Sequence, residues 1–213
     1  MSQVPTGYKQ TEVGVIPEEW EVQELEKISE VKSGKRLPLG KFLIDKQTSH
    51  PYIRVTDMFY GGVKVENIMF VPDDVYPAIK NYRIFKDEIF ISVAGTLGIV
   101  GKIPDILDGA NLTENANKLA NILCNRDYLL YFMMSSSIQG RIEAERTLGA
   151  QPKLALTRIR KFQIILPTSH EQEAIAEVLS DADALIEATE RLIAKKRLIK
   201  QGAMQHLITP KPD

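Results

Sequence analysis

Apolar residues recur at heptad spacing through the last forty residues of the chain. This spacing predicts one long helix with a single apolar seam. The helix is expected to run from about Ser169 to Leu207, on the order of 57 Å at 1.5 Å per residue. Ser169 is the expected N-cap, and Gln172 would complete a capping box. The seam residues expected to pair two helices are Ile175, Leu179, Ala182, Leu185, Ile186, Leu192, Ile193 and Ile199.

Shorter patterns in the first 168 residues predict strands broken by brief helices. Residues 1–19 indicate an extended arm because prolines and glycines exclude a long helix there. Residues 19–31 predict a strand that enters a short helix. Helical spacing indicates a helix over residues 127–148, capped by Asp127, and a short helix or turn over 154–160. Further strands are expected at 51–55, 63–65, 88–93, 119–123 and 162–167, with a return strand in the second half of 94–103.

These elements predict an α+β fold with two parts. Residues 1–168 form a globular recognition domain with a mixed or antiparallel sheet, and residues 169–213 form the long helix. With 213 residues and 44% hydrophobic content, the chain is long enough for one such core plus the helix.

Charge along the predicted helix is sorted by sign. From Glu171 to Glu190 every charged residue is acidic, and from Arg191 to Lys200 every charged residue is basic. Parallel packing of two copies would place like charges together, whereas antiparallel packing places each acidic half beside a basic half. The pattern therefore favours an antiparallel coiled coil in a dimer. The alternative is a solvated helix that docks on its own domain.

Composition limits the classes of protein. The N-terminus lacks a basic segment followed by an apolar one, and no segment approaches eighteen uninterrupted apolar residues. Together with a single cysteine, Cys124, this predicts a cytoplasmic protein without a membrane partner. A formal net charge of −1 argues against a general nucleic-acid coat, although basic residues crowd two segments, 32–46 and 141–161.

Motifs of catalysis are weak or missing in the sequence. Gly95, Gly98 and Gly101 have G-x-x-G-x-x-G spacing, which differs from the dinucleotide fingerprint. The histidines lack metal-ligand spacing. A metal-dependent nuclease needs a Pro-Asp pair followed by an acidic-x-Lys triplet, but here the triplet comes first. Neither D-P-P-Y nor N-P-P-Y occurs, which argues against an amino-methyltransferase of bases. We therefore expect a non-catalytic protein with no cofactor and no metal.

Side chains that can recognise bases are concentrated in the predicted loops. Arg and Lys pair with guanine, and Asn and Gln pair with adenine. Each residue alone is weak evidence because polar loops are ordinary. The candidates for DNA contact are Lys35, Arg36, Arg54, Thr56, Asn115, Asn117, Gln151 and Lys153.

Four segments together resemble a known family. They are Ile16–Val22 with Leu25, Tyr52–Asp57, Ile89–Gly98, and Ile164–Pro167 followed by Glu171–Gln172 and the long helix. In these segments the chain resembles a half-length specificity subunit of a type I restriction-modification system. Members of that family usually contain two target-recognition domains, each followed by such a helix.

The resemblance implies how this chain would act. One recognition domain and one helix imply a homodimer that recognises a bipartite, inverted-repeat target on double-stranded DNA. The implied partners are a DNA-methyltransferase subunit that carries S-adenosylmethionine and a restriction and translocase subunit. Two other functions stay open from the sequence: a coiled-coil adaptor without DNA recognition, and a small catalytic domain.

Overall fold

A computed structural model describes residues 4–145 and 153–208 of the chain. The chain divides after Glu173 into a globular unit and a second unit that holds the rest of the C-terminal helix. Among the described residues, no helix combines the length and apolar character needed to cross a membrane.

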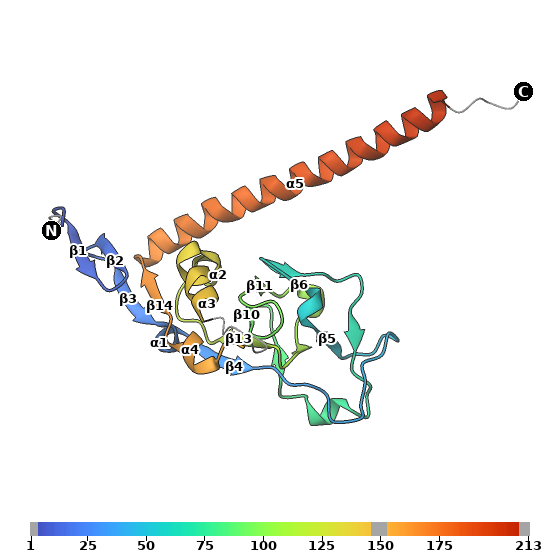
Figure 1. Ribbon diagram of the computed structural model, residues 1–213, viewed down its shortest axis with the longest axis horizontal. Coiled ribbons are helices and arrows are strands. Elements are labelled where there is room, and N and C mark those ends of the chain that lie inside the picture. Colours follow the sequence, from blue (N-terminus) through green and yellow to red (C-terminus); the bar gives the residue numbers. More distant parts are fainter. Residues whose placement is uncertain (1–3, 146–152, 209–213) are drawn as a thin grey trace, which may run out of the picture. The chain divides into compact units, whose positions relative to one another are not determined.

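Two four-stranded sheets form the centre of the described globular unit (Figure 1). The first has the order β11-β10-β13-β4 and is antiparallel throughout. The second has the order β8-β5-β12-β9, in which only β5 and β12 run parallel. The strands are β4 (Glu30–Ser33), β5 (Pro51–Ile53), β8 (Met69–Phe70), β9 (Arg83–Ile84), β10 (Ile89–Ser92), β11 (Val100–Lys102), β12 (Ala110–Leu112) and β13 (Ala116–Ala120).

Shorter elements complete the described globular unit. The expected arm is a hairpin of β1 and β2, and β3 pairs with β14 although more than a hundred residues separate them. Their bounds are β1 (Tyr8–Thr11), β2 (Gly14–Pro17), β3 (Glu21–Glu24), β6 (Met58–Phe59), β7 (Gly62–Val63), β14 (Gln163–Leu166), α1 (Leu25–Ile28), α4 (Leu156–Arg160), η1 (Val55–Asp57), η2 (Tyr76–Ala78) and η3 (Asp105–Leu107).

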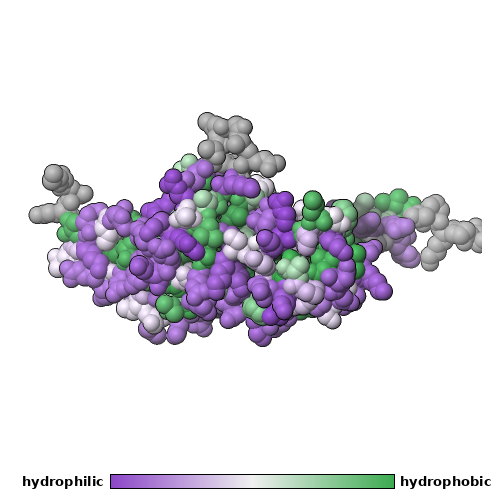
Figure 2. Space-filling view, turned by 90° about the horizontal axis from the view of Figure 1, so that it is seen from below, coloured by the Kyte–Doolittle hydropathy of each residue, from purple (hydrophilic) through white to green (hydrophobic). Residues whose placement is uncertain are grey.

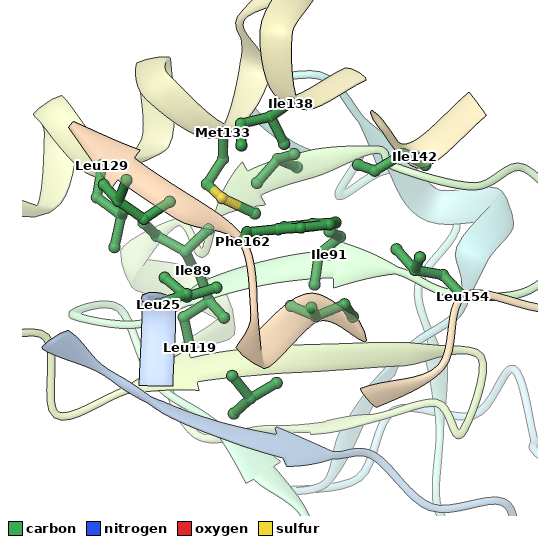
Figure 3. Close-up of a cluster of buried hydrophobic side chains, with 14 of the residues drawn as sticks. Leu25, Ile89, Ile91, Leu119, Leu129, Met133, Ile138, Ile142, Leu154 and Phe162 are labelled. Atoms are coloured by element: carbon green, nitrogen blue, oxygen red, sulfur yellow. The ribbon is translucent and has the colours of Figure 1, made fainter. Parts of the chain in front are cut away.

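Strand β10 separates two hydrophobic cores because side chains alternate across a strand. Ile89 and Ile91 point into a cluster with helix residues such as Leu129 and Met133 (Figure 3). Phe90, on the opposite face, packs in a second cluster with residues of β5 and β12. The first sheet is therefore covered on one face by helices and on the other by the second sheet. This arrangement fixes the positions of the strand ends.

The predicted helix over 127–148 is two helices in the described residues. Helix α2 (Arg126–Met134) ends and α3 (Ser136–Ala144) begins at Ser135, whose extended backbone interrupts the helix. The predicted cap Asp127 is wrong as well. The Asn125 side chain accepts from the Tyr128 N–H at 2.9 Å, whereas Asp127 pairs with Arg126 and Lys102. Serine and asparagine favour such boundaries because their side chains compete for backbone hydrogen bonds.

Most predicted strands are confirmed, with shifted boundaries. The hairpin over 88–103 is formed by β10 and β11, and the strand before the long helix is β14. The strand expected at 119–123 lies at 116–120 instead. Its end is set by Asn121, which has a positive φ of 49° that few residues other than glycine adopt readily.

Helix α5 (Ser169–Ile208) begins with a different cap from the predicted one. The capping box joins Thr168 and Glu171: the Thr168 N–H and hydroxyl donate to the Glu171 carboxylate at 3.0 and 2.7 Å. The indole N–H of Trp20 donates to the same carboxylate at 3.0 Å. Buried Gln172 instead accepts from the Asn125 N–H and donates to the Pro167 carbonyl. The first turn of α5 is thus hydrogen-bonded to the globular unit.

Candidate nucleic-acid interface

Three loops of the first sheet meet at one edge of the globular unit. Strands β4 and β10 both run antiparallel to β13, so their C-terminal ends lie beside its start. The Gly34 N–H donates to the Ala116 carbonyl at 3.0 Å, and the Val93 N–H donates to the Asn115 carbonyl at 2.7 Å. We call residues 34–36, 93–96 and 113–115 the loop edge. Lys153 joins it through a bridge to Ala94.

The second sheet supplies the neighbouring segment. The Lys35 N–H donates to the Leu112 carbonyl at 2.8 Å, and the Thr113 N–H donates to the Ile53 carbonyl at 3.1 Å. Since β5 and β12 are parallel, their C-terminal ends lie at the same edge. The chain leaves β5 there and enters η1, which carries the exposed residue Thr56. The structure therefore places candidates from four separate segments close together.

Gly34 is required for this close approach. A Cβ at this position would lie 2.1 Å from the Thr113 carbonyl oxygen and 2.4 Å from that of Leu112. Real Cβ atoms do not approach backbone oxygens so closely, so any side chain would push the loops apart. The short path from β4 to Lys35 depends on a residue without a side chain.

A mixed pair of charges lies on the loop edge. The Arg36 Nε is 3.1 Å from a carboxylate oxygen of Glu114, and the Thr113 hydroxyl donates to the other oxygen at 3.1 Å. The Arg36 side chain is still 72% exposed, so its remaining guanidinium N–H groups face solvent. The geometry offers a guanidinium for guanine beside a carboxylate that can accept from cytosine.

Two tyrosines contact Lys35, one at its backbone and one at its side chain. The Tyr52 hydroxyl donates to the Lys35 carbonyl at 2.9 Å, and the Lys35 Nζ lies 5.6 Å from the centre of the Tyr82 ring. Burial raises the pKa of Tyr52 to about 12, so this hydroxyl stays neutral and remains a donor. The Lys35 side chain is exposed and held above an aromatic face.

Two of the predicted DNA contacts, Arg54 and Asn117, are bound to other residues or buried within the protein. The Arg54 guanidinium donates to Asp57 at 2.6 and 2.9 Å and to the Asn67 carbonyl at 2.8 Å, and the bond to Asp57 raises the pKa of Arg54. Asn117 is 3% exposed within β13 and faces the helix-side core. Neither side chain is as exposed to solvent as those of Lys35 and Arg36. Gln151 lies outside the described residues.

Sequence reasoning missed Glu114 and Tyr52, which hold the two cations in place. Glu114 lies directly before the predicted contact Asn115, but a carboxylate was not expected among DNA contacts. Tyr52 was assigned only to a strand. Both roles depend on contacts between segments that are distant in sequence.

Beyond Glu173, helix α5 displays its apolar stripe to solvent. Leu185 is 69% exposed, Ile186 57% and Leu192 54%. Leu179, Ala182, Ile193 and Ile199 are exposed as well, and Ile175 is half-buried. One ion pair, Glu187 with Arg191 at 3.7 Å, spans the point where the charge changes sign.

Residues 17–195 match the family described as "Type I restriction modification DNA specificity domain". Because the match spans most of the chain, the chain belongs to this family, which consists of specificity components and not of catalytic ones. It is similar to two proteins of Methanocaldococcus jannaschii. The "Putative type I restriction enzyme MjaX specificity subunit" is 30% identical over 215 residues, 95% of this chain and 48% of that protein. The "Type I restriction enzyme MjaVIII specificity subunit" is 24% identical over 210 residues, 96% of this chain and 49% of that protein.

Solved structures share the fold. The HsdS subunit of Thermoanaerobacter tengcongensis superposes with a TM-score of 0.62 at 14% identity, over 87% of this chain and 42% of that one. The S subunit of M. genitalium gives a TM-score of 0.58 at 23% identity, over 86% and 44%. The α+β fold followed by a long helix is thus confirmed. The chain spans about half the length of the relatives it matches.

Proposed function

We propose that this chain is a DNA-recognition subunit of a type I restriction-modification assembly. In this proposal the loop edge contacts one half-site of a DNA target, and a second copy of the chain contacts the other half-site. Membership of the specificity-domain family supports DNA as the ligand. Arg36, Lys35, Asn115 and Lys153 on one edge supply the donors that base edges and phosphates accept.

The exposed apolar stripe on α5 is the observation that best supports a second copy of the chain in the assembly. A row of side chains such as Leu185 and Ile186, more than half exposed, is costly in water and typical of a helix that pairs. The acidic half and the basic half of α5 become complementary only when two helices run in opposite directions. Two copies of the described domain and helix would then form a symmetric dimer with two recognition domains.

The same proposal implies which other subunits would bind to the dimer. The dimer would position a DNA-methyltransferase subunit, and where present a restriction and translocase subunit, at the selected site. Much of the surface of α5 remains exposed for such contacts after one stripe is used.

Selection from a random pool tests this function. The chain is co-purified with a type I DNA methyltransferase from the same host, and the complex selects from a randomised duplex library. We expect enrichment of an inverted repeat with a fixed spacer. A complex that forms but enriches no sequence would instead support the coiled-coil adaptor without DNA recognition.

The division of labour between domain and helix is tested by changing the helix length. Deletion of seven residues from α5 shortens it by about 10 Å, or roughly 3 base pairs of duplex. We expect a shorter spacer and unchanged half-sites, and a seven-residue insertion should lengthen the spacer equally. Altered half-site sequences in either variant would contradict the proposed division.

A further inference from the structure

Two large apolar side chains stand in solvent on the segment that follows the loop edge. Leu39 is as exposed as in an extended peptide, at 105%, and Phe42 is 78% exposed. Hydrophobic residues gather in separate patches within a mostly hydrophilic face of the molecule (Figure 2). A fully exposed leucine and phenylalanine three residues apart in a globular unit therefore call for an explanation.

This exposure is built into the local structure. The Lys41 N–H donates to the Pro38 carbonyl at 3.0 Å, and Gly40 has the positive φ of 77° that such a turn needs. Leu37 and Leu43, on either side, pack against a buried cluster. Both ends of the turn are thus anchored, and Leu39 and Phe42 are held outward between them.

The surroundings of this turn are basic. Exposed Lys35 and Arg36 precede it and exposed Lys46 follows it beside Asp45. Arg36 also pairs with Glu114 at 3.1 Å, and Lys41 pairs with Asp74 at 2.7 Å, so cations still outnumber the carboxylates around the turn itself. An apolar tip flanked by cations suits a partner with an anionic surface and an apolar interior, which describes duplex DNA and its stacked bases. The stripe on α5 differs, because acidic residues flank one half of it and basic residues flank the other, an arrangement that suits another helix.

We propose that Leu39 and Phe42 form a wedge that enters the duplex at a base step beside the half-site. The inference rests on the proposed DNA-recognition function and adds a role that base-edge contacts do not supply. The turn begins two residues after Arg36, so a duplex on the loop edge lies within its reach. Insertion opens the step and bends the DNA, which favours targets whose flanking step is a flexible pyrimidine–purine step.

Fluorescence of 2-aminopurine tests the wedge in the full complex with the methyltransferase. The probe is placed in turn at each adenine of the selected target and in the flanking steps. The variants are Leu39→Ala, Phe42→Ala and Phe42→Trp, with Leu123→Ala as the matched control. Leu123 is also 77% exposed but lies beyond the opposite end of β13.

We expect a rise in fluorescence at one step per half-site for the wild type, because an unstacked probe is less quenched. Phe42→Ala should abolish this rise and weaken target binding about tenfold, while binding to non-specific duplex changes little. Leu39→Ala should act in the same direction, Phe42→Trp should restore the signal, and Leu123→Ala should match the wild type.

Other results overturn the wedge. A wild type that selects its target but gives no rise at any step, with Phe42→Ala binding equally well, refutes the wedge and leaves the proposed function intact. A Phe42→Ala variant that loses the methyltransferase or changes its self-association shows that the turn docks on protein. Failure of the wild type to select any sequence overturns both proposals.

Discussion

The globular unit and the helix beyond Glu173 place their apolar side chains in opposite ways. In the globular unit Ile89, Phe90 and Ile91 are 0% exposed within one strand. In the helix, Leu185 and Ile186 are more than half exposed. Most apolar side chains of the globular unit are thus packed in its cores, with exceptions such as Leu39 and Phe42, whereas most of those along the helix stay exposed within the single chain.

The two regions also differ in how their charged side chains are arranged. Inside the globular unit Lys118 and Glu88 form a nearly buried pair at 2.7 Å. Along the helix, acidic and basic residues are separated into two halves, and Glu187 pairs with Arg191 across the boundary between them. The globular unit is therefore stabilised mainly by its own contacts, whereas in the proposed dimer the helix would gain its contacts from a second copy.

Truncation of Phe90 should produce the largest loss of stability in the globular unit. Phe90→Ala is expected to lower the free energy of unfolding by about 3–5 kcal/mol, because it leaves a cavity between the two sheets. Urea unfolding followed by the fluorescence of Trp20 measures this change. Phe42→Ala is the control and should stay within about 0.5 kcal/mol. Equal effects of the two variants would contradict the described core.

A charge in the seam should act on association instead. Leu185→Asp is expected to weaken self-association about hundredfold, on the order of 2.7 kcal/mol, since pairing would bury an unpaired carboxylate. Analytical ultracentrifugation measures the change. Ala184→Asp adds the same charge on the other side of the helix and should have little effect. If both variants weaken association equally, the seam has been placed on the wrong face.

Gly34→Ala should disturb the loop edge. The added Cβ meets two backbone carbonyls, which predicts a loss of about 1–3 kcal/mol and weaker target binding. Gly140→Ala is the matched control in α3, where the added Cβ meets no atom within 4 Å. It should raise stability by about 0.5–1 kcal/mol through helix propensity. A neutral Gly34→Ala would show that the loops can separate freely.

The smallest effect concerns acid stability at the start of α5. Hydrogen bonds from Thr168 hold the pKa of Glu171 below its usual value of 4.5. A depressed folded-state pKa stabilises the protein above the usual value, and this contribution is lost as the pH falls through the folded pKa. Glu171→Gln should therefore lose less stability than the wild type on acidification. Identical pH profiles for the variant and the wild type would refute the role of the cap.

The sequence predicted elements where a periodic pattern is long. Heptads over forty residues located α5, and the run of apolar residues at 88–93 located β10. Strands of two or three residues, such as β8, β9 and β12, are too short to show a period. The break at Ser135 and the cap at Thr168 were missed because neighbouring residues offered equally good caps.

The candidate site was predicted by residue type and not by geometry. Lys35, Arg36 and Asn115 were chosen because loops rich in such residues suit DNA, and their role in binding stays a prediction. Asn117 lies opposite Ile91 in register and two residues before core residue Leu119, so it faces inward. That orientation would follow from the two-residue period, but only with the start of β13 placed at Ala116. The pairing of Arg36 with Glu114 depends on tertiary contacts.

Distance measurement between identical spin labels on the two copies tests the proposed antiparallel helix pair most directly. A label is attached at Lys200→Cys after replacement of the single native cysteine by Cys124→Ser, with Glu187→Cys as the control near the middle of the helix. Antiparallel helices should separate the labels at 200 by about 30–40 Å and bring those at 187 within about 20 Å. Short distances at both positions, or no dipolar coupling at either, would contradict the antiparallel dimer.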